Sequence, residues 1–257
     1  CLVGSEMCIR DSLTYKAVEL PILLSYSSSY TSLFWRQRYI FFESTRFIST
    51  VFSTFAHNKT INDMDTLLRE TVNAVVNSRF PEMSIEGRRQ IESILIREEF
   101  PKGVIALNEG EVAHELVFVG KGMLRQYYYK NGKDVTEHFS YEGCIVMCIE
   151  SLLKQVPTRL IIETLEPAII YLCPYDKMLQ LAKQNWEINM FYRKILEYSL
   201  IVSQTKADSW RFESARERYN LLLETHPEII KRAPLADIAS YLLMTPETLS
   251  RVRSGVL

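Results

Sequence analysis

The sequence has few of the features that mark a disulfide-rich protein or a protein with a uniformly basic, nucleic-acid-binding surface. Its 257 residues carry 30 basic and 31 acidic side chains, so the formal net charge is -1. This balance excludes a uniformly basic surface, although a local basic patch is still compatible with it. The five cysteines are odd in number and lack CxxC spacing, which argues against a disulfide scaffold or a zinc ribbon. Nine glycines and nine prolines exclude a low-complexity or collagen-like chain.

Residues 1–63 differ in amino-acid composition from the rest of the chain. Residues 1–12 resemble the translated read-through of a sequencing adapter. Residues 13–63 contain no glycine, fourteen Ser or Thr and eleven aromatic residues, without a persistent apolar period. The uncharged run 20–35 is broken by a proline and five serines, so it fits neither a secretory signal nor a membrane span. We expect residues 1–63 to be disordered translated upstream sequence with Met64 as the start; an extra domain is the alternative.

Motifs for the common reaction classes are also missing. The chain shows no Gly-rich phosphate loop, no GxSxG elbow and no paired catalytic carboxylates. His114, His138 and His226 have neither HxH nor HExxH spacing, so a cupin-type metal site is not expected. An iron–sulfur sensor needs about four thiolates, and after residue 63 only three cysteines remain, at positions 144, 148 and 173. We therefore predict no enzyme activity, no metal and no iron–sulfur cluster.

From Met64 onward the periodicity predicts helices, then short strands, then helices again. Helices are expected over 64–77 and 84–96, with Ser84 as the cap of the second. Short strands separated by Gly-containing turns predict a sandwich or barrel of about 70 residues. The expected strands are 104–107, 116–119, 123–129, 135–139, 160–162 and 168–173.

A long amphipathic helix follows Pro174. Its apolar residues fall at spacings of 3, 4, 3, 4 and 3: Ile188, Phe191, Ile195, Tyr198, Val202 and Thr205. A helix of about twenty residues with this seam can pair with a copy of itself. The alternative is a helix packed only on its own barrel. We favour pairing, because a long helix needs tertiary burial.

Residues 234–253 have the pattern of a helix, a tight turn and a second helix. Thr245 is a natural N-cap and Pro246 a natural first residue of the second helix. Apolar residues of that helix would face inward and leave a polar outer face, as in a recognition helix that enters the major groove. A helical hairpin that only packs at the end of a domain is the alternative.

These segments resemble the Crp/Fnr family of bacterial transcription regulators. The most specific part is Asp237-Ile-Ala-Ser-Tyr-Leu, followed by Thr245-Pro-Glu-Thr-Leu-Ser-Arg251, which is similar to the family's winged helix-turn-helix. The family's cyclic-nucleotide-binding-type β-roll has short strands separated by glycines. Two segments here resemble these strands: Lys121-Gly-Met-Leu-Arg-Gln-Tyr127 and Glu142-Gly143.

The resemblance, from about Met64 to Leu257, implies an α+β fold with three parts. These are an N-terminal double-stranded β-helix (jelly-roll) sensor domain over 64–180, a dimerisation helix over 181–210 and a C-terminal winged helix-turn-helix over 211–257. It also implies a homodimer paired through Ile188, Phe191, Ile195, Tyr198 and Val202. Because the chain ends four residues after Arg253, we expect a clipped C-terminus.

The family's recognition helix carries an Arg-Glu pair and an Arg four residues after the Glu. Here those positions are Pro246, Glu247 and Arg251, so the first Arg is missing. Glu247 can accept from a cytosine N4 amino group, and Arg251 can donate to guanine O6 and N7, each worth about 1–3 kcal/mol of discrimination. Phosphate contacts are expected from Thr245, Thr248, Ser250 and Arg253. Leu242-Leu243 stands where the family's turn has Gly, so the turn must avoid a positive φ or be strained.

Cyclic-nucleotide binders of the family have Gly-Glu at the start of a short helix and then Arg-Ser or Arg-Thr. Here Met147-Cys148 and Thr158-Arg159 occupy those positions, so we do not expect cyclic AMP to bind. If a ligand occupies the roll, its candidate contacts are Glu150, Ser151, Thr158 and Arg159. A solvated loop without a ligand is the alternative.

The sequence therefore predicts a cytoplasmic, sequence-specific DNA-binding transcription regulator. As a homodimer it would bind a near-palindromic site in double-stranded DNA, with half-sites about 10 bp apart. RNA polymerase and an unidentified small-molecule effector are further expected partners, and no membrane is. The rival prediction is a β-roll ligand-binding protein or a cupin-like enzyme whose C-terminal hairpin does not bind DNA. A regulator that binds DNA without any small ligand is also open.

Overall fold

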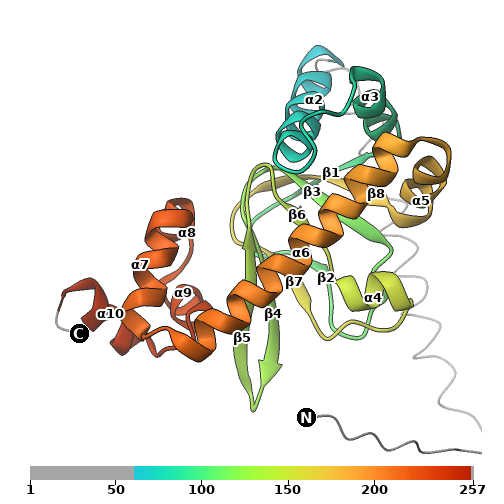
Figure 1. Ribbon diagram of the computed structural model, residues 1–257. Helices are drawn as coiled ribbons and strands as arrows, with labels where there is room; N and C mark the ends of the chain where they lie inside the picture. Colours follow the sequence, from blue (N-terminus) through green and yellow to red (C-terminus); the bar gives the residue numbers. More distant parts are fainter. Residues whose placement is uncertain (1–60, 256–257) are drawn as a thin grey trace, which may run out of the picture. The chain divides into compact units, whose positions relative to one another are not determined.

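The computed structural model describes residues 61–255 (Figure 1). The predictions for residues 1–60, including the adapter-like segment, lie outside the described residues. Helix α2 (Ile61–Asn77) begins before the expected start at Met64. No helix in the described part is long and apolar enough to cross a membrane.

The described residues contain two four-stranded antiparallel sheets. One has the order β1-β8-β3-β6 and the other β2-β7-β4-β5. The strands are β1 (Ile96–Phe100), β2 (Ile105–Leu107), β3 (Glu115–Lys121), β4 (Leu124–Lys130), β5 (Lys133–Ser140), β6 (Ile145–Val146), β7 (Ile161–Thr164) and β8 (Ala168–Pro174). Together with the short helix α4 (Ile149–Lys154) they form the part of the molecule that we call the roll.

Strand β3 shows why both faces of the first sheet are apolar. Its side chains alternate between the two faces, as the pleat requires. Val117 and Val119 pack between the two sheets with Ile162 of β7, whereas Leu116 and Phe118 pack under the helices. A strand buried on both faces lacks clean polar alternation, and this accounts for the continuous apolar run that predicted it.

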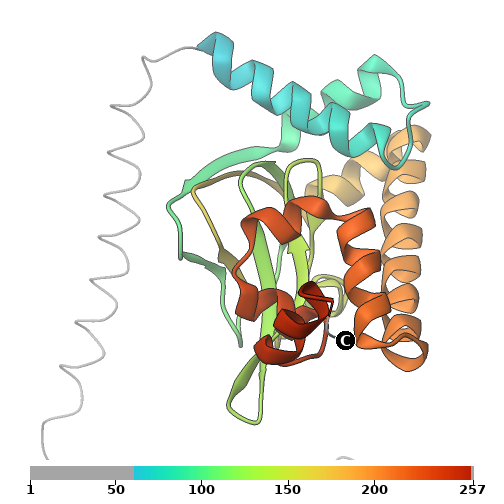
Figure 2. The same ribbon diagram turned by 90° about the vertical axis from the view of Figure 1, so that its left-hand side faces the viewer.

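Four helices cover the outer face of that sheet (Figures 1 and 2). They are α2, α3 (Ile85–Ile94), α5 (Tyr175–Gln184) and the first half of α6 (Trp186–Phe212). Ser84 caps α3 as predicted, because its hydroxyl accepts from the Gly87 N–H at 3.0 Å. α3 ends at Ile94 and is followed by the edge strand β1, a segment that the sequence analysis assigned to the helix up to 96.

The long helix α6 begins at Trp186 and not at residue 181, and its predicted seam faces inward. Ile188, Phe191 and Ile195 are buried in the core under the roll's own sheet. Tyr198 and Val202 line a cavity described below. The expected pairing through Ile188, Phe191 and Ile195 is therefore corrected, because these residues pack on their own chain. Pairing through Tyr198, which is 43% exposed, and through Val202 stays a prediction.

The C-terminal helices follow directly from α6. They are α7 (Ala215–Thr225), α8 (Pro227–Arg232), α9 (Leu235–Tyr241) and α10 (Pro246–Arg253). Their apolar cluster includes Leu222, Ile238 and Leu249, and it continues into the roll through Met123 and Phe139. No strand follows α10 in the described part of the chain, so the predicted wing stays a prediction.

Candidate nucleic-acid interface and an adjoining cavity

Helix α10 is fixed at its start and along its inner face. The Thr245 hydroxyl accepts from the Thr248 N–H at 3.2 Å, and Pro246 occupies the first turn, so the predicted cap is confirmed. Leu249 and Val252 are buried. Because these contacts orient the helix, its outer side chains have a defined direction relative to the rest of the protein.

The outer face of α10 presents the residues predicted to read DNA. Glu247, Ser250, Arg251 and Arg253 are exposed, and Thr248 is half-buried beside the cap. No ion pair joins either arginine to any residue of 61–255. A hydrogen bond with the Thr245 hydroxyl, and to a lesser extent the charge of Arg251, lowers the pKa of Glu247, which is therefore ionised at neutral pH. Five of the six predicted contacts are therefore exposed, Thr245 at the cap among them, and only Thr248 is half-buried.

The turn between α9 and α10 is strained at one position. Leu243 has φ +52°, in the left-handed region, and its exposed side chain gives little compensating burial. The turn closes through the Met244 N–H, which donates to the Ala239 carbonyl at 2.9 Å. A non-glycine residue in this conformation costs about 1–2 kcal/mol, so the strain anticipated for Leu242-Leu243 is present.

A polar cluster that sequence reasoning missed attaches α9 to the roll. Arg125 on β4 is only 5% exposed and forms ion pairs with Asp134 and with Asp237 of α9. Beside it, the Thr136 N–H donates to the Ser240 hydroxyl at 2.6 Å. A single arginine in a strand is ordinarily solvated, so only the buried position of Asp237 on an amphipathic helix could have indicated the pair.

A second attachment runs from α6 to strand β5, which carries Glu137. The Lys206 ammonium lies 3.2 Å from Glu137 and near the rings of Trp210 and Tyr241. Burial lowers the pKa of Lys206 to about 8. Burial, with a smaller contribution from Lys206, lowers the pKa of His138 to about 4. His138 is therefore neutral at physiological pH.

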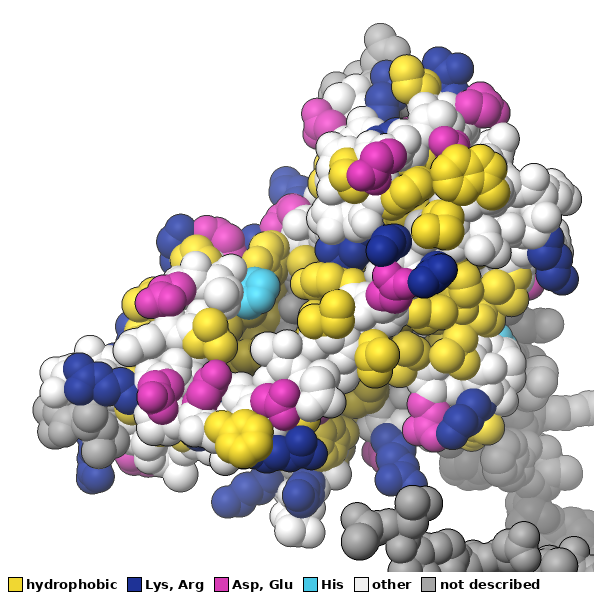
Figure 3. Space-filling view, viewed as in Figure 1, with side chains coloured by type: hydrophobic (Ala, Val, Ile, Leu, Met, Phe, Trp, Pro, Cys, Tyr) yellow, Lys and Arg dark blue, Asp and Glu magenta, His cyan; other side chains and the backbone are white. Residues whose placement is uncertain are grey.

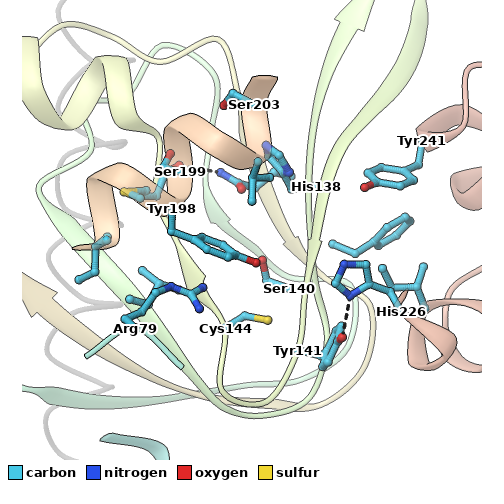
Figure 4. Close-up of a pocket in the computed structure, with 17 residues that line it drawn as sticks. Arg79, His138, Ser140, Tyr141, Cys144, Tyr198, Ser199, Ser203, His226 and Tyr241 are labelled. Carbon is cyan, nitrogen blue, oxygen red and sulfur yellow. Dashed lines mark hydrogen bonds between the residues drawn. The ribbon is translucent and has the colours of Figure 1, made fainter. Parts of the chain in front are cut away.

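A cavity of about 150 Å³ lies where the roll, α6 and the C-terminal helices meet (Figure 4). Arg79 reaches it from the end of α2, with its guanidinium 3.5 Å from the centre of the Tyr198 ring. On the opposite side the Tyr141 hydroxyl and His226 Nδ1 are hydrogen bonded at 3.0 Å. Cys144 lies between them, and burial raises the pKa of its thiol.

The four predicted effector contacts line neither this cavity nor the smaller one inside the roll. The Ser151 hydroxyl accepts from the Ala113 N–H at 2.9 Å, and the Thr158 hydroxyl accepts from the Leu160 N–H at 2.9 Å, so both are engaged within the fold. Glu150 pairs with Lys154 at 3.0 Å on the surface, and Arg159 is exposed.

The interior of the roll has the wrong charge for a cyclic phosphate. A cavity of about 90 Å³ lies between the sheets, and the only ionisable groups that residues 61–255 contribute to it, besides Cys148, are Glu98 and Glu115. Burial and the charge of Glu115 raise the pKa of Glu98. Since no cation lines this space, a bound anion would be repelled. Within residues 61–255, no group of three or more His, Cys, Asp or Glu side chains could hold a metal ion.

Comparison with known proteins finds similar folds among solved structures only. No family model and no curated protein matches the chain. Among solved structures, FixK2 from Bradyrhizobium japonicum is similar over 63% of this chain and 84% of its own, with 20% identity and a TM-score of 0.54. The c-di-GMP responsive global regulator CLP of Xanthomonas campestris is similar over 65% and 89%, with 15% identity and a TM-score of 0.53.

A protein from Eubacterium rectale assigned to the Crp/Fnr family of transcriptional regulators is similar over 69% of this chain and 87% of its own. Its identity is 17% and its TM-score 0.52. At such identities the likeness is one of fold. The described part of the chain therefore has the fold of Crp/Fnr regulators.

Proposed function

We propose that the protein is a sequence-specific DNA-binding transcription regulator and not an enzyme. The observation that carries this proposal is the outer face of α10. That face displays Glu247, Ser250, Arg251 and Arg253, while Leu249 and Val252 hold the helix to its neighbours. Exposed arginines that form no ion pair within residues 61–255 are available to phosphates and base edges. The fold shared with FixK2 and with the global regulator CLP supports this proposal.

Individual roles follow from the chemistry of each side chain. Arg251 would donate two hydrogen bonds to a guanine, and the ionised Glu247 would accept from a cytosine amino group. Ser250 and Arg253 would contact phosphates, together with Thr248 and Thr245. Because Arg253 meets a charge common to every sequence, its loss should weaken all sites alike.

The active unit would be a homodimer paired through the outer side of α6. Leu200 and Ile201 are 72% and 63% exposed, and Phe212 near the end of the helix is also exposed. Figure 3 shows hydrophobic side chains along the course of α6, interrupted by charged ones. Two recognition helices related by a two-fold axis would fit half-sites about 10 bp apart. A cytoplasmic location and contact with RNA polymerase are further parts of this proposal.

The rival function is a roll that binds a ligand or acts as a cupin-like enzyme, with a hairpin that does not bind DNA. Selection of DNA from a randomised duplex pool by the full chain, at a stated salt concentration, separates the two. We expect enrichment of an inverted repeat, and loss of that enrichment in Arg251→Gln. Arg89→Gln, at an exposed arginine of α3, is the matched control. Equal enrichment by the Arg251 variant would contradict the recognition-helix assignment.

A further inference from the structure

We propose that the cavity between the roll, α6 and the C-terminal helices binds a small organic monoanion, a carboxylate with a compact apolar body. This cavity is separate from the residues predicted to contact an effector and from the space inside the roll. Its walls come from the end of α2, from β4 and β5 with the turn that follows, from α6, and from the helices after α7. Figure 4 shows side chains from these elements converging on one space.

The charge of the lining selects an anion. Among the described residues, no Asp, Glu or Lys side chain lines the cavity, and Arg79 is the only arginine that does. Both histidines in the lining, His138 and His226, have lowered pKa values because they are buried. The thiol of Cys144 is protonated for the same reason. At neutral pH the lining therefore carries one formal charge, which is positive.

An acidic group near the lining does not cancel that charge. Glu142 is close enough to Cys144 to contribute to its raised pKa, but it does not line the cavity. Both of its carboxylate oxygens are held by Arg232, at 2.7 and 3.0 Å. Because Glu142 is paired in this way, it leaves Arg79 without a counter-ion within the described residues.

Arg79 is oriented while most of its donors stay free. The Tyr198 ring lies under the guanidinium at 3.5 Å, and such stacking fixes the plane of the group. One terminal nitrogen, Nη1, donates to the Ser78 hydroxyl and carbonyl at 3.0 and 3.3 Å. A guanidinium has five N–H donors in a planar fork. The remaining ones suit a carboxylate, which accepts two parallel hydrogen bonds.

The rest of the lining defines the body of the ligand. Apolar walls are provided by Phe139, Ile145, Met147, Val202 and Ile229, and hydroxyl groups by Ser199 and Ser203 on α6. A volume of about 150 Å³ is below the roughly 300 Å³ at which drug-sized sites begin. A single ring or a short chain bearing a carboxylate fits this description, and a nucleotide is too large for it.

The position of the cavity gives the ligand a consequence for DNA binding, and this part rests on the proposed function. His226, Ile229 and Tyr241 belong to the C-terminal helices, whereas Arg79, Tyr198 and Cys144 belong to the other side. A ligand that contacts both groups stabilises the arrangement in which they face each other. A ligand that binds one orientation of α10 relative to α6 more tightly than another shifts the population toward the orientation that it prefers.

The first test uses Cys144 as a reporter of the local charge and needs no knowledge of the natural ligand. The full chain is alkylated with iodoacetate, which is anionic, or with iodoacetamide, which is neutral, and modification of Cys144 is followed by mass spectrometry. Cys148 and Cys173 are buried and serve as internal references. We expect the iodoacetate-to-iodoacetamide rate ratio to fall about fivefold in Arg79→Gln, since one nearby charge is removed. Arg193→Gln should keep the wild-type ratio, and an unchanged ratio in Arg79→Gln would overturn the proposal.

The second test measures binding without DNA, so it is independent of the proposed function. Benzoate, phenylacetate and hexanoate are compared with their uncharged amides by calorimetry and by protection of Cys144 from iodoacetamide. At least one carboxylate should bind and protect Cys144, its amide should not, and Arg79→Gln should abolish the difference. Ser199→Phe, which fills the cavity without touching Arg79, should also abolish binding. Failure of all three carboxylates, or equal binding of the amides, would overturn the proposal.

Discussion

Arg125 and Asp237 form an ion pair of 3.0 Å that joins strand β4 of the roll to helix α9. Arg125 is almost completely buried and also donates to Thr136 at 2.9 Å and pairs with Asp134. Because the Ser240 hydroxyl completes the cluster, two residues of α9 are attached to adjacent strands. The position of α10 relative to the roll thus depends on polar contacts as well as on apolar packing.

Removing the carboxylate of Asp237 should therefore weaken the attachment of α9. We expect Asp237→Ala to lower the free energy of unfolding by about 2 kcal/mol, less than the 3–5 kcal/mol of a fully orphaned charge because Asp134 still pairs with Arg125. Urea denaturation followed by circular dichroism measures this. Asp208→Ala, which breaks the exposed pair with Arg211, is the control and should cost at most about 1 kcal/mol. Equal losses in both variants would contradict the special role of Asp237.

Much of the local structure could be predicted because its signals are short-range. Ser84 and Thr245 are caps whose hydroxyls accept from nearby N–H groups, so a few residues suffice to identify them. The edge strand β1 was missed because Ile96–Phe100 contains three charged residues and is mostly exposed, which leaves no apolar alternation to recognise.

The site was harder to predict because its residues meet only in three dimensions. The a/d spacing of α6 is the same whether the helix packs on its own sheet or on a partner, and here Ile188, Phe191 and Ile195 pack on their own sheet. Arg79 and His226 are far apart in sequence and show no motif, yet both line one cavity. Their approach follows from the docking of α9 on β5, which no local pattern encodes.

A substitution in the strained turn should stabilise the protein rather than destabilise it. Leu243→Gly should stabilise the protein by about 1 kcal/mol, because glycine adopts φ +52° without the steric penalty that leucine has there. Thermal unfolding should show a higher Tm. Leu221→Gly, within helix α7, is the control and should destabilise by about 1 kcal/mol, since glycine is a poor helix former. Destabilisation by Leu243→Gly would mean that packing of the side chain outweighs the strain.

His138 should make the protein sensitive to mild acid. Its pKa falls from 6.5 to about 4 on folding, so between these values the unfolded chain binds more protons than the folded one. The sign follows from linkage: this contribution to stability is complete above pH 6.5 and is lost as the pH falls toward 4, by up to about 3 kcal/mol.

Unfolding free energies measured between pH 4 and 7 test this contribution. His138→Gln should have a shallower loss of stability over that window than the wild type. His114→Gln, at an exposed histidine, should keep the wild-type slope. If the His138 variant lost stability as steeply as the wild type, the acid sensitivity would arise elsewhere.

Substitution of the two arginines of α10 should weaken DNA binding in two different ways. Arg251→Ala should weaken binding to the selected site by about 1–3 kcal/mol and relax the preference at one base pair, because it removes a base contact. Arg253→Ala should weaken selected and random duplexes alike and reduce the slope of log affinity against log salt by about one. Fluorescence anisotropy over a salt series separates the two effects. Identical behaviour of the two variants would show that α10 contacts only the backbone.

The outer side of α6 should control the oligomeric state. Leu200→Glu and Ile201→Glu place charges on two highly exposed apolar positions, so the folded chain should tolerate them. In a dimer, these positions would be buried in both copies, and we expect dissociation to become at least about 100-fold easier, which is roughly 3 kcal/mol. Sedimentation velocity over a concentration series measures this. Leu223→Glu on α7 is the control for an added charge at an exposed leucine. If both α6 variants dimerise like the wild type, or if the wild type is monomeric throughout, the second copy does not pair through this surface.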